Sequence, residues 1–202
     1  MSATGTESRN PRSRGLSAKG TREVLELMND EDAGVAAAVR LAIPQIARAV
    51  DAIVGAIAKG GHVIYVGAGT SGRLGALDAS EMPPTFGVPP ELFRAVIAGG
   101  DTALRLAVEG AEDDSVSGRR DVAQILGQDD VIVGISASGG APYVLGGLEA
   151  GAGIASATVG ITCNAGSPLA RRSGIPIVID VGPEIVAGSR ACSGRASSPY
   201  PP

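Results

Sequence analysis

The stretch His62-Val63-Ile64-Tyr65-Val66-Gly67-Ala68-Gly69-Thr70-Ser71-Gly72-Arg73 places a short apolar run directly before a turn rich in glycine and hydroxyl groups. The helix-compatible residues 74–79 follow it. A strand, a glycine-rich turn and a helix in this order present backbone N–H groups to an anion at the helix N-terminus. We therefore predict a phosphate-binding turn, in which Thr70 and Ser71 add hydroxyl donors and Arg73 adds a positive charge.

Two familiar phosphate motifs do not fit this turn. No Gly-Lys-Ser/Thr follows at the spacing of a Walker loop. The pattern Gly67-x-Gly69-x-x-Gly72 has the glycine spacing of the dinucleotide fingerprint, but no carboxylate stands about 20 residues later, at the end of a second strand, to hold a ribose. A small phosphorylated molecule suits the turn better, and the alternative is a strand-to-helix turn that binds no ligand.

The composition favours a domain of helices packed on a parallel sheet. Alanine, glycine, valine and isoleucine dominate the 202 residues, aromatic residues make up 2%, and tryptophan is absent. Small side chains of this kind suit close packing of helices on a sheet. The formal net charge of −4 and the absence of a basic run argue against nucleic acid as the main partner.

The remaining composition argues against membrane and metal sites. The N-terminus has no signal-peptide pattern, and no apolar run reaches the length of a membrane span. Cys163, Cys192 and the single histidine, His62, show no metal-binding or redox spacing. We expect a cytoplasmic chain without a metal or a membrane partner, in which His62 has a structural role.

The N-terminal region is expected to form an arm followed by helices. Residues 1–19 are polar, and Thr21 is expected to cap a short helix. A second helix is expected to start near Asn29-Asp30, and Pro44 should kink or split the apolar pattern that continues to Ile57. Further along, the tandem Pro83-Pro84 is expected to be irregular.

Five apolar runs alternate with helical segments. Strands are expected at residues 62–66, 93–97, 130–135, 157–162 and 175–181, with helices near 102–108, 121–126 and 143–150. This alternation predicts right-handed crossovers and a parallel, doubly wound sheet, in which ligands bind beyond the carboxyl ends of the strands.

A second small-residue loop, Ser136-Ala137-Ser138-Gly139-Gly140-Ala141-Pro142, follows the third strand. Because parallel strands end at the same edge of a sheet, this loop and the first turn are expected to converge there. Two hydroxyl-rich loops at one edge favour a phosphosugar site. Either loop alone is also compatible with ordinary turn chemistry.

Carboxylates are the candidates for proton transfer, because histidine and metal chemistry are not expected. Glu81 lies at the end of the helix that leaves the first turn, two residues before the proline pair, whose turn is expected to hold it near the sheet edge. Glu112 lies in the acidic segment 109–114, for which a solvated surface is the simpler interpretation. Two glutamates whose pKa values differ can serve as acid and base.

Several longer blocks resemble one family. They occur in the right order from near the N-terminus to about Ser189, which makes the resemblance specific. The blocks are Thr6–Pro11, Val66–Glu81, Pro83–Gly87, Ile97–Gly100, Val108–Asp114 and Val181–Glu184. On these residues the chain resembles the N-acetylmuramic acid 6-phosphate etherases.

The resemblance implies the sugar isomerase (SIS) fold: an α/β, three-layer αβα sandwich with a five-stranded parallel sheet, here preceded by N-terminal helices, and a homodimer. It also implies a cytoplasmic lyase of cell-wall amino sugar recycling that needs no cofactor. Such an enzyme removes the C2 proton of the open-chain sugar, expels D-lactate from C3 and adds water there. The products are N-acetylglucosamine 6-phosphate and D-lactate.

The same resemblance assigns roles to residues of this chain. Glu81 matches the proton donor to the departing lactate oxygen, and Glu112 matches a second catalytic residue, to which we assign C2 proton transfer. The 6-phosphate would be held by Gly69, Thr70, Ser71, Ser136 and Ser138. Three regions are expected: an N-terminal arm with helices at 1–50, a SIS sugar-phosphate domain at 51–189, and a disordered, aberrant tail at 190–202.

Two departures from the family leave other functions open. Gly140 and Ala141 stand where the family usually has an arginine and a threonine, and the sequence after residue 189 departs from the family as a truncated or frameshifted chain would. These departures favour a non-catalytic phosphosugar-binding regulatory module or an inactive remnant. A sugar-phosphate isomerase shares the C2 proton transfer. A DNA-binding regulator is disfavoured, since no helix-turn-helix with a basic face precedes the first strand.

Overall fold

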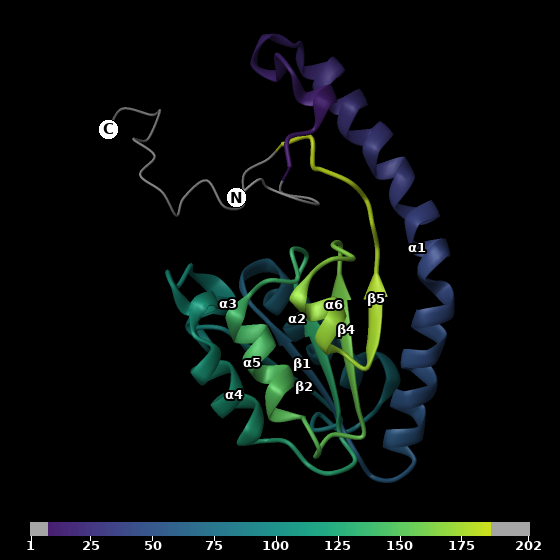
Figure 1. Ribbon diagram of the computed structural model, residues 1–202, viewed down its shortest axis with the longest axis vertical. Helices are drawn as coiled ribbons and strands as arrows, with labels where there is room; N and C mark the ends of the chain where they lie inside the picture. The colour runs from purple at the N-terminus through teal and green to yellow at the C-terminus, as the bar shows by residue number, and fades with distance from the viewer. Residues whose placement is uncertain (1–7, 187–202) are drawn as a thin grey trace.

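The computed structural model of the chain describes residues 8–186 and has a five-stranded parallel sheet at its centre (Figure 1). The strands lie in the order β2-β1-β3-β4-β5, and all neighbours are parallel. Their bounds are β1 (Val63–Gly67), β2 (Phe93–Ile97), β3 (Val131–Ile135), β4 (Ala157–Thr162) and β5 (Ile175–Val178). The predicted fold class, with its five parallel strands, is confirmed.

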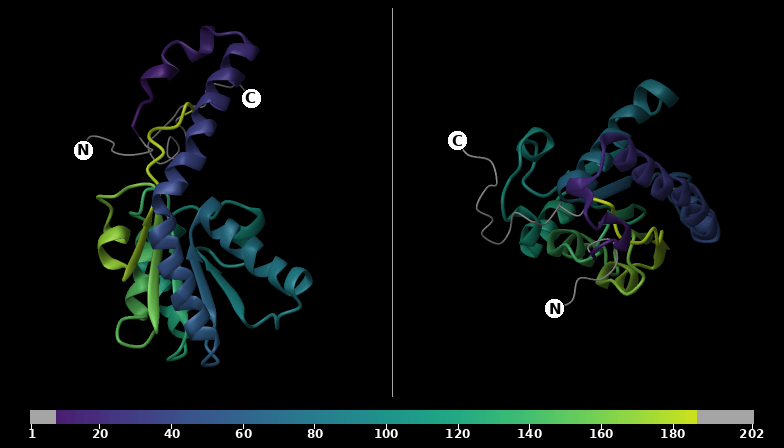
Figure 2. Two further views of the ribbon diagram at one scale, coloured as in Figure 1. Left: turned by 90° about the vertical axis from the view of Figure 1, so that its right-hand side faces the viewer. Right: turned by 90° about the horizontal axis from the view of Figure 1, so that it is seen from above.

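Helices connect the strands and cover both faces of the sheet. They are α1 (Thr21–Ile57), α2 (Gly69–Phe86), α3 (Thr102–Arg105), α4 (Ser115–Ala123), α5 (Pro142–Ala150) and α6 (Pro168–Arg172), with short 3-10 helices η2 (Pro11–Ser13), η3 (Leu16–Ala18) and η4 (Ala111–Asp113). Figure 2 shows α1 and α2 on one face of the sheet. The helices α4, α5 and α6 cover the other face, which gives three layers (Figure 1).

Two apolar clusters form the core, one on each face of the sheet. On the α1 face, Ala42, Ala49 and Ala56 pack against strand residues such as Val133 and Val159. On the other face, the strand residues Ile64, Val66 and Ile132 pack against α5 and α6. Alternate residues of a strand point to opposite faces, so the continuous apolar runs of β1 and β3 serve both clusters.

A buried carboxylate joins β1 and β3 at the sheet edge where these strands begin. Asp130 Oδ1 accepts hydrogen bonds from the His62 backbone at 2.8 Å and lies 3.0 Å from His62 Nδ1, while Oδ2 accepts from the Gly127 backbone at 2.7 Å. Burial acts to raise the pKa of Asp130, but the hydrogen bonds outweigh it and hold this pKa below its usual 3.8. His62 is thus part of a structural contact.

Helix α1 is one continuous helix of 37 residues, which differs from the expectation of two shorter helices. Its N-cap is Gly20, whose side chain cannot cap, so the predicted capping role of Thr21 is wrong. Pro44 lies on the exposed side, where water can solvate the carbonyl that its missing N–H leaves free. Figure 1 shows the helix as a continuous, curved rod whose N-terminal half extends beyond the sheet.

By length and composition alone, α1 is the single helix of residues 8–186 that is apolar enough to cross a membrane. The expectation that no apolar stretch is long enough to span a membrane is therefore wrong by the criterion of length and composition. An alanine-rich helix meets this criterion even though polar residues are scattered along it. In the structure, the stripe formed by Ala42, Ala49 and Ala56 packs on the sheet.

The proline pair Pro83-Pro84 lies inside the last turn of α2, not in an irregular segment as predicted. Helix interiors exclude proline because it removes a backbone donor and crowds the preceding turn. Here the helix ends two residues later, at Phe86, with Gly87 in the left-handed conformation and its N–H donating to the Pro83 carbonyl at 2.8 Å. The prolines therefore affect only the end of the helix.

Helix α4 begins six residues before the predicted start at residue 121. Asp114 is its N-cap and accepts from the Ser117 backbone at 2.9 Å. A Cβ atom on Gly118 would lie 2.0 Å from the Tyr143 carbonyl oxygen, and one on Gly146 would lie 2.0 Å from that of Ser115. These two glycines let α4 and α5 cross closely, a tertiary contact that the local polar pattern does not reveal.

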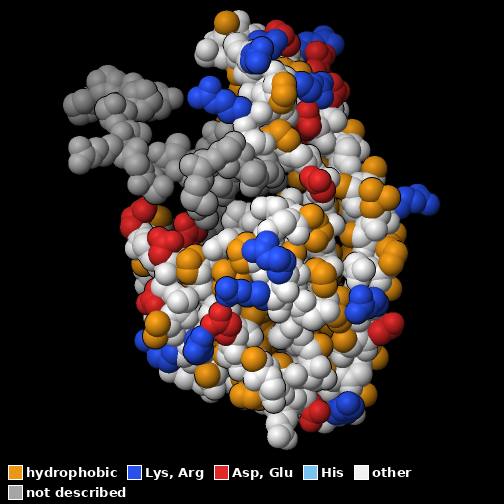
Figure 3. Space-filling model, in the orientation of Figure 1, with side chains coloured by type: hydrophobic (Ala, Val, Ile, Leu, Met, Phe, Trp, Pro, Cys, Tyr) orange, Lys and Arg blue, Asp and Glu red, His pale blue; other side chains and the backbone are white. Residues whose placement is uncertain are grey.

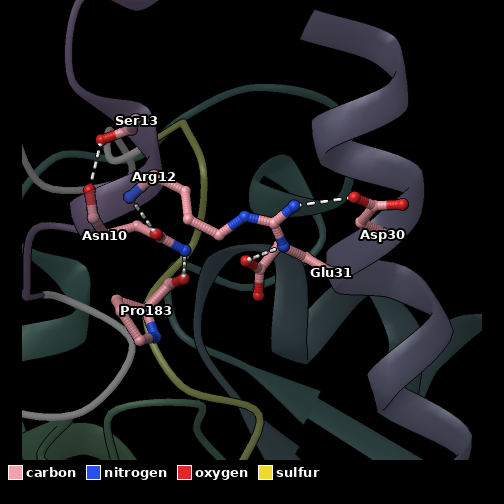
Figure 4. A network of polar contacts seen from close by, with 6 residues as sticks. All are labelled: Asn10, Arg12, Ser13, Asp30, Glu31 and Pro183. Atoms are coloured by element: carbon pink, nitrogen blue, oxygen red, sulfur yellow. Dashed lines mark hydrogen bonds and ion pairs between the residues drawn. The ribbon is translucent and has the colours of Figure 1, made fainter. Parts of the chain in front are cut away.

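The N-terminal arm is fastened to α1 and to the segment after β5 (Figure 4). Arg12 pairs with Asp30 at 2.7 Å and Glu31 at 3.0 Å. The buried Asn10 side chain donates to the Pro183 carbonyl at 2.8 Å and accepts from the Arg12 backbone at 2.9 Å. The arm, the projecting half of α1 and the chain near Pro183 are thus held together.

The expected division of the chain into three regions is not tested by the structure. Helix α1 runs through residue 50, the expected start of the sugar-phosphate domain, and this division stays a prediction. The expected tail at residues 190–202, and the change in sequence after residue 189, lie outside the described residues.

Candidate functional site

The candidate site lies at the carboxyl ends of β1 and β3. These two strands are neighbours, and their last residues, Gly67 and Ile135, pair in register. The chain leaves β1 toward β2 on one side, whereas β3 continues to β4 on the other side. The direction of winding therefore changes between β1 and β3, which is where open α/β sheets bind ligands. The expectation that both loops share one edge is met.

The first loop leads directly into α2. Gly69, Thr70 and Ser71 form the first turn of this helix, whose amide hydrogens have no partners four residues back. A Cβ on Gly67 would lie 2.5 Å from the Gly72 Cα, so the strand end and the helix start approach each other as only glycines allow. The exposed Thr70 and half-buried Ser71 add hydroxyl groups beside these amides.

The second loop leads into α5 on the opposite face of the sheet. Ser136 is buried, and its Oγ accepts from the Gly139 backbone at 3.1 Å. Half-buried Ser138 accepts from the Gly140 backbone at 3.3 Å. The N-cap of α5, Ala141, makes no side-chain capping bond. The positive ends of two helices, α2 and α5, thus lie at the same edge of the sheet, next to the paired ends of β1 and β3, an arrangement that favours an anion.

Residues at the end of β4 and directly after it hold the second loop in place, and the sequence analysis did not identify them. Thr162 Oγ1 donates to the Ala137 carbonyl at 3.0 Å, and Asn164 Nδ2 donates to that of Ser138 at 3.4 Å. Gly139 has a φ of 66°, and a Cβ there would lie 2.3 Å from Ser167 Oγ. The signal was the polar run that directly follows the fourth apolar strand.

Arg73 does not point into the crevice, which corrects the expectation that it adds charge to the first turn. Its Nε donates to the Ala103 carbonyl at 2.9 Å, and its Nη2 donates to the Leu106 carbonyl at 3.3 Å. The guanidinium thus satisfies the carbonyls at the end of α3. Since neither loop contains a lysine or another arginine, their donors are backbone amides and hydroxyls.

Glu81 is exposed and lies far along α2 from the first loop. Twelve residues separate it from Gly69, which corresponds to about 18 Å along the helix axis. Because Pro83 and Pro84 continue the helix, no turn returns Glu81 to the sheet edge, contrary to the expectation. The predicted role of Glu81 as a proton donor is not tested by this distance within one chain.

Glu112 lies in η4, between α3 and α4, and is exposed. The neighbouring Ala111 packs against the core cluster that contains α5. Figure 3 shows acidic side chains gathered on this side of the domain. The structure therefore places Glu112 beside the helix that begins at the second loop, and Glu81 away from both loops.

Cys163 lies beside the second loop, where its backbone N–H donates to the Ala137 carbonyl at 2.9 Å. Burial, with smaller effects from Glu184 and Asp180, raises the pKa of the Cys163 thiol, so its reactive thiolate is disfavoured. Within residues 8–186, no group of three His, Cys, Asp or Glu side chains is arranged to hold a metal ion.

Residues 45–152 match the family model described as the glucokinase regulatory protein N-terminal SIS domain, over more than half of the chain. The chain belongs to the SIS-domain family. Among solved structures, a phosphoheptose isomerase from Francisella tularensis has a TM-score of 0.60 and 23% identity, covering 77% of this chain and 85% of that one. This likeness shows the fold.

Two relatives that are closer in sequence carry the same name. A protein of Jannaschia sp. named N-acetylmuramic acid 6-phosphate etherase is 50% identical over 97% of this SIS chain. A protein of Vibrio vulnificus with the same name is 54% identical over 91% of it. The chain spans 63% and 62% of the length of these two relatives. The resemblance found in the sequence is thus confirmed by relatives of that name.

Proposed function

We propose that this SIS chain is the sugar-phosphate part of an N-acetylmuramic acid 6-phosphate etherase. The observation that carries the proposal is that the two hydroxyl-rich loops follow the paired ends of β1 and β3, in a chain about half identical to relatives of that name. The proposed activity is that of a cytoplasmic carbon–oxygen lyase of peptidoglycan recycling. It needs no cofactor and acts as a homodimer.

The phosphate of the substrate would bind at the crevice. The amides of the α2 first turn and the Thr70 and Ser71 hydroxyls approach it from one side. Ser136 and Ser138 approach it from the other. Oriented amides at two helix starts stabilise a bound anion without a cation. This anchor leaves the sugar to extend toward the acidic segment that contains Glu112.

The reaction would proceed by elimination and then addition. With the sugar in its open-chain form, Glu112 accepts the C2 proton, which the neighbouring aldehyde acidifies. The C3–O bond breaks, Glu81 protonates the departing oxygen of D-lactate, and an α,β-unsaturated aldehyde forms. Water then adds at C3 to give N-acetylglucosamine 6-phosphate. Well-placed acids and bases of this kind each accelerate a reaction by roughly 10²–10⁴-fold.

A coupled D-lactate assay tests this function. We expect the wild type to release D-lactate, and Glu81→Gln and Glu112→Gln to lower the rate by about 100-fold or more. Exposed Glu109 in the same acidic segment provides the matched control, Glu109→Gln, which should keep its activity. Exchange of deuterium from solvent into C2 separates the roles, because Glu112→Gln should lose it and Glu81→Gln should retain it.

A second candidate is a phosphosugar-binding regulatory module without catalysis. It is favoured by the absence of Lys from both loops, by the contacts that direct Arg73 to the carbonyls of the α3 segment, and by the regulatory protein whose name the family model bears. Phosphosugar binding measured by calorimetry, with no D-lactate released by the wild type, would support this module and contradict the etherase.

A further inference from the structure

Three consecutive carbonyl groups of the second loop accept hydrogen bonds from residues at the end of β4 and after it. These carbonyls belong to Ala137, Ser138 and Gly139. Their donors are, in the same order, Thr162 Oγ1 at 3.0 Å, Asn164 Nδ2 at 3.4 Å and the Leu169 backbone at 3.0 Å. We call these three donors the carbonyl clamp. The backbone of the loop is thus bound on the side where β4 lies.

Thr162 is at the centre of the carbonyl clamp. Its side chain is buried, and its Oγ1 donates to the Ala137 carbonyl while it accepts from the Asn164 backbone at 3.2 Å. The Oγ of buried Ser167 donates to the same hydroxyl at 3.5 Å. A Cβ on Gly139 would lie 2.7 Å from Thr162 Oγ1, so the loop packs directly on this hydroxyl. Because an unpaired polar group in the interior is costly, these bonds favour one conformation of the loop.

Binding the carbonyls on one side directs the N–H groups of the loop to the other side. The peptide bonds of the described residues are trans. In a planar trans peptide unit, the C=O of one residue and the N–H of the next point in opposite directions. The N–H groups of Ser138, Gly139 and Gly140 therefore point away from the residues that follow β4. Since β3 lies between β4 and β1, they are directed to the side where the first loop lies.

The second loop keeps hydrogen-bond donors for a ligand on that side. Within residues 8–186, no hydrogen bond engages the Ser138 N–H. Ser136 Oγ and Ser138 Oγ accept from the backbone N–H groups of Gly139 and Gly140. Each hydroxyl has one hydrogen to donate, and accepting these bonds leaves that hydrogen for another acceptor. A turn whose amides and hydroxyls donate in one direction suits an anion.

We propose that Thr162 is a positioning residue of the phosphosugar site, because it holds the carbonyls of the second loop toward β4 and so directs the N–H groups toward the bound phosphate. The inference rests on the proposed function for the ligand, whereas the orientation of the loop rests on the carbonyl clamp alone. Thr162 is buried and does not itself contact the ligand. Since neither loop contains lysine and Arg73 contacts the α3 segment, affinity depends on how these dipoles are oriented.

The binding of N-acetylglucosamine 6-phosphate to three variants, measured by calorimetry, tests this role. Thr162→Val removes the hydroxyl and should weaken binding by about tenfold. Thr162→Ser keeps the hydroxyl and should restore most of the affinity. Thr158→Val is the matched control, because Thr158 lies at the other end of β4, where its Oγ1 accepts from the Gly174 backbone at 2.9 Å. This control should bind as the wild type does, and unchanged affinity of Thr162→Val overturns the inference.

The kinetics of D-lactate release separate positioning from a general loss of stability. The phosphate takes no part in the bonds that break and form, so its contacts are equally strong in the ground state and the transition state. Weakening such contacts raises KM and leaves kcat unchanged. We expect this pattern for Thr162→Val, with KM raised about tenfold. A lower kcat with an unchanged KM would show that fewer chains are folded, and it would overturn the positioning role.

Amide hydrogen exchange, followed by NMR, tests the orientation of the loop without a ligand. The Gly139 N–H donates to the Ser136 carbonyl at 3.0 Å, and it should exchange faster in Thr162→Val than in the wild type or in Thr158→Val. Exchange at the wild-type rate shows that Thr162 does not hold the loop, and it overturns the inference while the etherase stands. A wild type that neither binds the phosphosugar nor releases D-lactate contradicts the proposed function, and hydrogen exchange then decides the role of Thr162 in the loop by itself.

Discussion

Substituting Gly72 by alanine should loosen the first loop and weaken the binding of phosphosugars. Gly72 is buried where α2 leaves β1. A Cβ on it would lie 2.5 Å from Cγ1 of buried Ile97 and 2.9 Å from the Gly67 carbonyl. Carbon atoms in contact normally lie about 3.5–4.0 Å apart. Either the start of α2 or the end of β2 must therefore move.

The size of the effect follows from two opposing terms. Overpacking of a core costs about 1–3 kcal/mol, whereas replacing glycine by alanine in a helix gains up to about 1 kcal/mol. We expect a net loss of about 1–2 kcal/mol. For a chain of this size, that loss lowers Tm by about 2–4 °C per kcal/mol.

Urea unfolding followed by circular dichroism measures this loss, since the chain has no tryptophan for fluorescence. Gly55→Ala is the control: Gly55 lies in α1 with open space around its Cβ position, and alanine there should stabilise by about 0.5–1 kcal/mol. Calorimetry with N-acetylglucosamine 6-phosphate should show weaker binding for Gly72→Ala alone. A Gly72→Ala chain as stable as Gly55→Ala would refute the packing argument, and unchanged affinity would refute the placement of the site.

Three further substitutions test contacts away from the phosphate. Arg73→Gln should lower the unfolding free energy but leave the salt dependence of phosphosugar binding unchanged, because the guanidinium contacts carbonyls of the α3 segment. If the affinity of the variant depends less steeply on salt concentration than that of the wild type, Arg73 contacts the bound phosphosugar and this reasoning is wrong. Asp130→Asn should lower stability at neutral pH. Because the folded-state pKa of Asp130 is depressed, its contribution to the free energy of unfolding is present above about pH 4 and is lost as the pH falls. The free energy of unfolding of the variant should therefore fall less steeply than that of the wild type as the pH is lowered. Asn10→Ala should speed hydrogen exchange of the N-terminal arm by removing the bond to Pro183, with exposed Ser17→Ala as a control that leaves exchange unchanged.

The sheet could be predicted from the sequence because its signals are local. Runs such as Val131–Ile135 are too short and too apolar for surface helices, and turns of glycine follow them. The rule that parallel strands end at one edge then brought the loops after β1 and β3 together. Their roles in binding, and those of Glu81 and Glu112 in catalysis, stay predictions.

Helix limits and side-chain directions could not be predicted, because they depend on contacts between distant residues. Pro44 and Pro83 predict helix breaks locally, yet one lies on an exposed face and the other lies in a last turn. Arg73 looks like a phosphate ligand until the α3 carbonyls are seen beside it. The position of Glu81 follows from the length of α2, which the proline pair conceals.

The proposed anchor of main-chain amides would have a consequence for how this chain can change in sequence. At the crevice between β1 and β3, the donors of two helix starts belong to the backbone, which point mutations of side chains leave in place. Removing any single hydroxyl group should therefore lower the affinity for a phosphosugar only slightly. If these turns bind the phosphate as proposed, the residues around the sugar ring could change in sequence while the backbone amides still held the phosphate ester.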